Sequence, residues 1–112
     1  MSIERRTTKR FSVVNLSLFN RETDEEIGQV INLSEGGLLV VASAEMPRGQ
    51  ELGLRIPFDN DGQEINLDVD AKVAWCTREN LKDEFYNIGM EFAAHSKEQY
   101  SFLKQMILLY GA

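Results

Sequence analysis

Apolar and polar residues alternate with period two through most of the chain. In the longest run, 65–76, Trp75 falls on the apolar face of a strand and Cys76 on the polar face. The other predicted strands are 14–18, 27–33, 38–42, 52–58 and 86–92. Six or seven strands with short connections and one buried face predict a closed or nearly closed antiparallel barrel, because closure removes exposed strand edges.

Local turn chemistry marks where these elements end. Asn60-Asp61-Gly62 is typical of a hairpin turn, and Pro47-Arg48-Gly49 interrupts the chain before the next strand. Near the end of the sequence the apolar period becomes helical. Ser96 followed by Gln99 fits a capping box, which predicts a helix over roughly 97–110.

Composition limits the kind of molecule and its partners. A chain of 112 residues, 43% of them hydrophobic, suits a single domain with one core. Its apolar runs are shorter than the roughly 18 residues that a membrane span needs, so we expect a cytoplasmic protein without a membrane partner. Cys76 is the single cysteine, so an intramolecular disulfide is excluded.

The charge balance is acidic, with 12 Lys and Arg against 18 Asp and Glu and a net charge of −6. Binding of a long nucleic acid depends on many contacts between cations and phosphates, so a small barrel that binds nucleic-acid polymers is disfavoured. Positive charge is nevertheless concentrated in one short stretch, RRTTKR at 5–10. Taken alone, this stretch is typical of a basic terminal arm.

A second short stretch, NLSEGG at 32–37, lies between two predicted strands. Asn32 and Ser34 are two residues apart, so in extended chain their side chains face the same way. Gly36 and Gly37 allow positive φ or a close approach of the backbone to a ligand. Taken alone, the stretch is typical of a turn stabilised by Ser and Asn.

The two stretches together carry a more specific pattern. Arg6 and Arg10 give R-x-x-x-R, and Asn32, Ser34 and Gly37 give N-x-S-x-x-G. This order resembles the PilZ family of bacterial cyclic di-GMP (c-di-GMP) receptor domains, and the resemblance extends from Arg5 to the terminal helix. The Val73-x-Trp75 strand and the strand over 88–92 are similar to later strands of that family.

The resemblance implies an all-β fold, a six-stranded antiparallel, Greek-key-like β-barrel followed by a C-terminal α-helix. It implies one domain over 1–112, with a flexible ligand-clasping segment at 1–10, the barrel at 11–93 and the helix at 96–110. It also implies a receptor that changes conformation with c-di-GMP and signals to a protein partner in bacterial motility, biofilm or virulence control. No catalysis and no cofactor are expected.

The resemblance also assigns the ligand site. The implied c-di-GMP-binding residues are Arg5, Arg6, Arg10, Asn32, Ser34, Gly36 and Gly37. Arginine forks suit guanine O6 and N7 as well as phosphates. Arg5, immediately before the motif, is similar to a family position at which Arg favours a stacked pair of ligands.

Other residues carry weaker functional signals. Asp68 and Asp70 share a strand face and are expected on a solvated outer surface. The acidic stretch 59–62 is explained by a hairpin turn rather than by a metal site. His95, before the helix, fits a surface or capping role. One alternative that remains is a PilZ-like adaptor that binds protein without nucleotide. The broad apolar face of the helix is expected to be buried within the domain, and the alternative is contact with a partner chain or a second copy in a homodimer.

Overall fold

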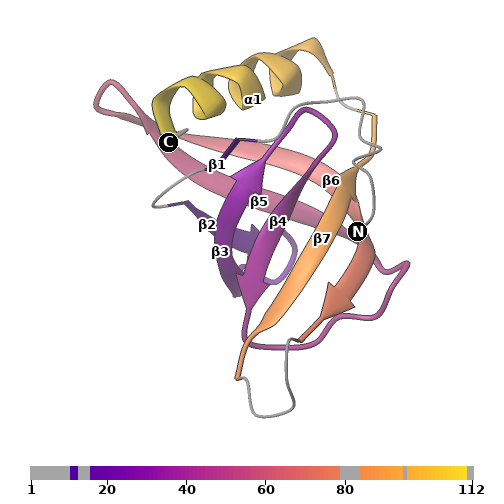
Figure 1. Cartoon of the computed structure of the whole chain (residues 1–112). Coiled ribbons are helices and arrows are strands. Elements are labelled where there is room, and N and C mark those ends of the chain that lie inside the picture. The colour runs from indigo at the N-terminus through magenta and orange to yellow at the C-terminus, as the bar shows by residue number, and fades with distance from the viewer. Residues whose placement is uncertain (1–10, 13–15, 79–83, 95, 111–112) are drawn as a thin grey trace.

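The computed structural model of the chain describes residues 11–12, 16–78, 84–94 and 96–110, and it consists mainly of strands (Figure 1). The elements are β1 (Phe11–Ser12), β2 (Ser17–Asn20), β3 (Glu26–Leu33), β4 (Gly37–Ala42), β5 (Glu51–Asn60), β6 (Gln63–Thr77), β7 (Tyr86–Phe92) and α1 (Lys97–Tyr110). Among the described helices, none is long and apolar enough to cross a membrane.

Six of these strands form a closed antiparallel ring. Their order is β3-β2-β5-β6-β7-β4, and β4 pairs back onto β3. The strands β2, β3 and β4 follow one another, and β5 then returns to lie beside β2, which is the Greek-key order. The predicted six-stranded barrel with a C-terminal helix is therefore confirmed, and the short strand β1 adds to β3 outside the ring.

The turn between β5 and β6 shows why the ring can close with short connections. Asn60 pairs with Gln63, which leaves Asp61 and Gly62 as the two loop residues. Their φ angles are 55° and 86°. Positive φ at both positions is the geometry that matches the twist of two-residue hairpins, so the hairpin prediction at this position is confirmed.

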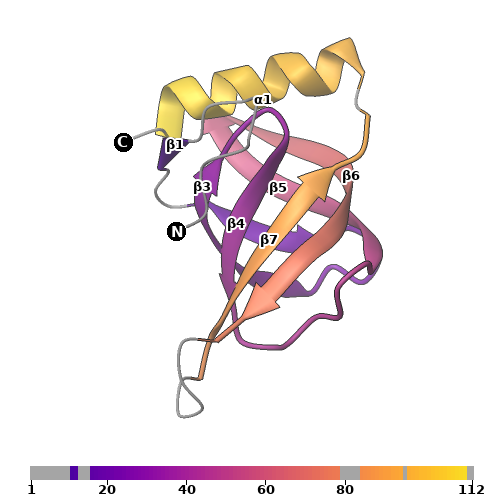
Figure 2. The same cartoon turned by 45° about the vertical axis from the view of Figure 1, so that its right-hand side comes forward.

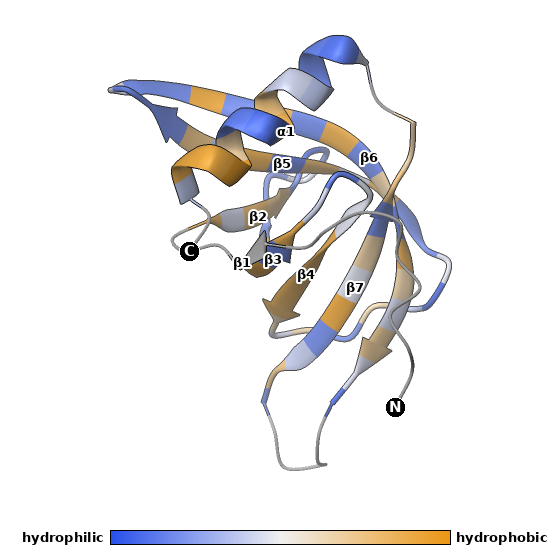
Figure 3. Cartoon of the chain, turned by 45° about the horizontal axis from the view of Figure 1, so that its top comes forward, coloured by the Kyte–Doolittle hydropathy of each residue, from blue (hydrophilic) through white to orange (hydrophobic). Residues whose placement is uncertain are grey.

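The interior of the barrel holds the apolar side chains of the alternating runs, and α1 covers one open end (Figures 1 and 2). Leu103 and Met106 of α1 are fully buried against this core. Phe102 meets Phe58 of β5 edge to face, with ring centroids 6.3 Å apart. Alternating colours along the strands in Figure 3 show the period that the sequence predicts.

Polar contacts hold α1 in place at both ends. The Ser96 N–H donates to Gln99 Oε1 (2.7 Å) and the Gln99 N–H donates to Ser96 Oγ (3.1 Å), so the predicted capping box is present. Gln99 Nε2 also donates to the carbonyl oxygen of Asp68 on β6. At the other end, the Asp59 N–H donates to the hydroxyl oxygen of Tyr110. The helix is thus fixed to the β5–β6 hairpin along its length.

The predicted faces of Trp75 and Cys76 are wrong. The register of β6 against β7 shifts between Val73 and Trp75, because Ala74 has no partner on β7. Such a β-bulge moves every following side chain to the opposite face. Trp75 is consequently exposed on the outside of the barrel, and Cys76 packs against the core.

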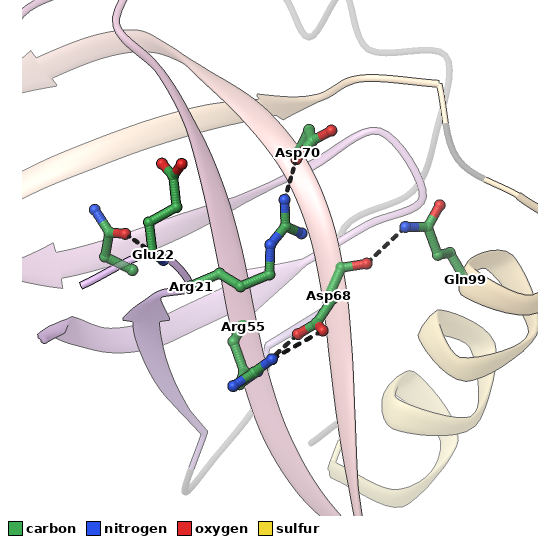
Figure 4. Close-up of polar contacts among 7 residues, drawn as sticks. Arg21, Glu22, Arg55, Asp68, Asp70 and Gln99 are labelled. Carbon is green, nitrogen blue, oxygen red and sulfur yellow. Dashed lines mark hydrogen bonds and ion pairs between the residues drawn. The ribbon is translucent and has the colours of Figure 1, made fainter. Parts of the chain in front are cut away.

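Asp68 and Asp70 lie on the outer face of β6, as expected, but both are engaged in ion pairs (Figure 4). Two nitrogens of Arg55, on the neighbouring strand, donate to the two carboxylate oxygens of Asp68 at 2.8 and 3.1 Å. This hydrogen bonding raises the pKa of Arg55. Arg21 reaches from the turn after β2 to Asp70, at 2.6 Å. The pairs join three segments across the outside of the sheet.

Candidate functional site

A short strand pairing joins the two sequence stretches that predict a ligand site. Phe11 and Ser12 of β1 pair with Leu33 and Asn32 of β3. Arg10 directly precedes Phe11 in the sequence, and consecutive Cα atoms are about 3.8 Å apart. The two residues that directly follow the arginine stretch in the sequence are therefore paired with the first two residues of NLSEGG. Arg5, Arg6 and Arg10 themselves lie outside the described residues.

The NLSEGG stretch forms a tight turn between β3 and β4 that is closed by its own hydrogen bonds. The Ser34 N–H donates to the carbonyl oxygen of Gly37 (2.9 Å), and the Ser34 hydroxyl donates to the same oxygen (3.3 Å). The Gly36 N–H donates back to Ser34 Oγ (3.2 Å). Ser34 is buried, at 1% exposure, so its clearest role here is to shape the turn. A contact between Ser34 and ligand stays a prediction.

The two glycines of the turn meet protein backbone. A Cβ on Gly37 would lie 2.1 Å from the carbonyl oxygen of Met90 on β7, so only glycine lets β4 and β7 approach this closely. Gly36 accepts a hydrogen bond from the Phe92 N–H. Positive φ occurs at Gly49 and Gly62 among the described glycines and not in this turn. The turn therefore needs glycine at Gly37 for strand packing, irrespective of a ligand.

A row of residues runs from Asn32 across the outside of the barrel. Asn32 pairs with Leu39, Leu39 with Gly89, and Gly89 with Trp75. We call these four residues the Asn32 row. Neighbouring strands are about 4.8 Å apart, so the row spans about 14 Å. This length suits a small, elongated ligand lying across four strands.

Trp75 ends the row as a flat aromatic surface. A Cβ on Gly89 would lie 2.4 Å from Cε2 and Nε1 of the indole, so the ring lies directly over the glycine. Its side chain is 41% exposed. An aromatic face in this position can stack on a nucleic-acid base. The alternating pattern placed Trp75 inside the barrel; the signal that could have placed it outside is the pairing of a tryptophan with a glycine on the next strand.

The turn is also connected to α1. The Tyr100 hydroxyl, in the first part of α1, donates to Glu35 Oε2 at 3.1 Å. This hydrogen bond, with some burial, raises the pKa of Tyr100. The Lys104 ammonium lies 5.3 Å from the centre of the Tyr100 ring. A change in the conformation of the turn can therefore reach the helix through one direct contact.

A hollow of about 790 Å³ is lined in part by Gly36 of the turn. Its lining includes Arg21 and Asp70, which form an ion pair (Figure 4), the carboxylates of Glu22, Glu51 and Glu91, and the ammonium of Lys72. Carboxylates repel phosphates. Among the described residues, no group of three or more His, Cys, Asp or Glu is placed to hold a metal ion.

Comparison with known families identifies this architecture. The sequence profile of the PilZ domain matches residues 4–109. The chain belongs to the PilZ family. The PilZ domain of YcgR from Escherichia coli, solved with c-di-GMP, has a TM-score of 0.70 and 16% identity, covering 95% of this chain and 91% of that one. Comparison with curated proteins gives no match.

Two longer solved proteins contain a region of similar fold. MotI, the inhibitor of motility of Bacillus subtilis, has a TM-score of 0.71 and 21% identity, covering 96% of this chain and 51% of that one. MrkH from K. pneumonia, solved in complex with c-di-GMP, has a TM-score of 0.70 and 16% identity, covering 95% of this chain and 52% of that one. These likenesses concern the fold, and this chain spans about half the length of both proteins.

Proposed function

We propose that this PilZ domain is a receptor for c-di-GMP that acts by changing conformation and not by catalysis. The observation that carries the proposal is the pairing of β1 with β3, in which Phe11 and Ser12, directly after the R-x-x-x-R stretch in the sequence, meet Leu33 and Asn32. The family match and the solved PilZ domain of YcgR with c-di-GMP support the same ligand.

The chemistry of the ligand fits the two ends of the Asn32 row. Guanine presents O6 and N7 as paired acceptors, and an arginine fork meets both or grips a phosphate in bidentate fashion. Arg6 and Arg10 would supply these contacts beside Asn32. At the other end, a second guanine can stack on the exposed indole of Trp75. The negative phosphates would then lie near the arginines and away from Glu91.

Arg5 bears on the number of ligands. It adds a further cation to the motif, and two stacked c-di-GMP molecules carry twice the phosphate charge of one. We infer that Arg5 favours a stacked pair. A titration that ends at one ligand per chain would argue against this role while leaving the receptor intact.

The conformational change would be recognised by a protein partner in motility, biofilm or virulence control. Ordering of the segment before β1 over the barrel would change the surface next to the turn. The Glu35–Tyr100 hydrogen bond gives α1 a direct contact with that turn. Leu108 and Leu109 on α1 are 83% and 50% exposed, so the helix offers apolar surface to such a partner.

Calorimetric titration of c-di-GMP into the wild type and into Arg10→Ala tests the proposal. We expect micromolar or tighter binding to the wild type. Loss of a bidentate arginine contact is worth about 1–3 kcal/mol, so Arg10→Ala should weaken binding by roughly tenfold to a hundredfold. Arg48→Ala, in the loop between β4 and β5, removes an arginine away from the motif and should bind like the wild type.

Absence of binding by the folded wild type would refute the receptor. The exposed end of α1 would then favour the alternative, an adaptor that binds protein without nucleotide.

A further inference from the structure

We propose that the ligand site extends beyond the motif residues to Asn87, whose amide hydrogen-bonds the edge of the base stacked on Trp75. This inference rests on the proposed c-di-GMP receptor function and adds a contact residue to the same site. It is carried by the position of Asn87, by its unpaired amide and by the charges around it.

The strand register places Asn87 beside the aromatic surface. Asn87 and Gly89 are two residues apart on β7, so their side-chain positions lie on the same outer face. Trp75 covers Gly89, and the β6 residue that pairs with Asn87 is Thr77, two positions from Trp75. Along a strand, two residues span about 6.6 Å, which is close to the width of a purine with its hydrogen-bonding edge.

The Asn87 amide is half-buried and has no hydrogen-bond partner among the residues that the structure describes. An amide has two N–H donors and an acceptor oxygen, and partly buried polar groups normally find partners. Within the described part of the chain, nothing supplies one to Asn87. A partner therefore has to come from outside this part, from water or from a ligand.

The charges near Asn87 and Trp75 also limit which part of the ligand can lie at this end of the Asn32 row. The two described residues that pair with Asn87 are uncharged: Val41 on β4 and Thr77 on β6. On the other side of Gly89, the exposed Glu91 stands opposite Lys72 of β6, so this pair of charges is balanced. The residues that pair with Asn87 and Trp75 supply no cation to hold a phosphate, whereas a neutral base needs none. The base, rather than the phosphate, therefore fits the space over Trp75.

The amide matches an edge of guanine. Guanine places the O6 acceptor next to the N1–H donor, and an amide can donate to the first while it accepts from the second. Trp75 would fix the plane of the base, and Asn87 would fix its rotation in that plane. The two residues together would favour one orientation of the ligand on the barrel.

Matched amide variants test the inference. Gln29 stands on the same outer face, two strands away from Asn87, and its amide bonds Ser17 and Glu26. We expect Asn87→Ala to weaken c-di-GMP binding by about tenfold, the loss of one base-reading contact, and Gln29→Ala to leave the Kd unchanged. The melting temperature of Asn87→Ala should equal that of the wild type, since no described residue loses a hydrogen bond.

Trp75 is the only tryptophan, so its fluorescence reports stacking directly. At saturating c-di-GMP, the fluorescence of Trp75 should be quenched as fully in Asn87→Ala as in the wild type. Saturation of the variant should need a higher ligand concentration. Wild-type binding together with an unchanged Kd for Asn87→Ala would overturn this inference and leave the receptor standing. Failure of the folded wild type to bind c-di-GMP would overturn both.

Discussion

At the scale of single residues, two glycines on the outer face of the barrel have different neighbours and therefore different roles. A Cβ on Gly37 would meet the backbone carbonyl of Met90, whereas a Cβ on Gly89 would meet the side-chain ring of Trp75. A backbone atom in a closed ring of strands cannot move without disturbing the neighbouring pairs. A side chain on the surface can turn away. Gly37 thus supports the fold, and Gly89 supports the position of the indole.

Alanine variants of these glycines should separate the two roles. Gly37→Ala should lower the free energy of unfolding by about 1–3 kcal/mol or more, as overpacking does, measured by urea denaturation. Gly89→Ala should keep most of the stability but shift the emission of Trp75 and weaken c-di-GMP binding. Equal stability losses in both variants would contradict this assignment.

Tyr100 is the titratable residue that joins the turn to α1, and its pKa is raised because its hydroxyl donates to Glu35. Since the folded pKa lies above the unfolded value of about 10, the contact is fully present below that pH and is lost as the pH rises through the folded pKa. Tyrosinate absorbance of the wild type minus that of Tyr100→Phe should therefore titrate above about pH 10.

The matched control for this titration is Glu35→Gln, which removes the charged acceptor and should lower the midpoint of Tyr100. A midpoint at or below the ordinary value in the wild type would show that the hydrogen bond does not form in solution.

At the scale of elements, local chemistry was predictable and pairing between strands was not. The Asp61-Gly62 turn and the Ser96–Gln99 capping box depend on neighbouring residues, so the sequence pattern located both. The bulge at Ala74 depends on how β6 meets β7, and alternation along β6 alone cannot reveal it. For this reason Trp75, the aromatic surface of the candidate site, was expected in the core.

In the candidate site, too, local sequence features were predictable and contacts between strands were not. The motif residues were recognisable from their order, but the two-residue strand that brings Phe11 and Ser12 to Asn32 is too short to show a period. A ligand contact of Ser34 stays a prediction, while its burial and its hydrogen bonds with Gly36 and Gly37 in the turn could not be foreseen from the motif. Asn87 was not predicted, because its environment comes from the strands on either side.

At the scale of the whole molecule, the net charge of −6 and the sequence pI of about 4.8 restrict the ligands to small ones. A local cluster of arginines can hold two phosphates, but a duplex would also meet the acidic remainder of the surface. We therefore expect no retention of a random-sequence DNA duplex in a gel-shift assay at physiological salt, under conditions in which c-di-GMP binds. Retention that weakens steeply with salt would contradict this expectation.

The bulge in β6 has a consequence for reading related sequences. Because Ala74 is the residue without a partner, a one-codon deletion at this position would leave Val73 paired with Met90 and Trp75 paired with Gly89 in a regular ladder, with the indole still outside the barrel. Substitutions at the neighbouring positions would leave the face of Trp75 unchanged. In an alignment of chains with this fold, a gap here would therefore be compatible with the aromatic surface wherever the tryptophan itself is retained.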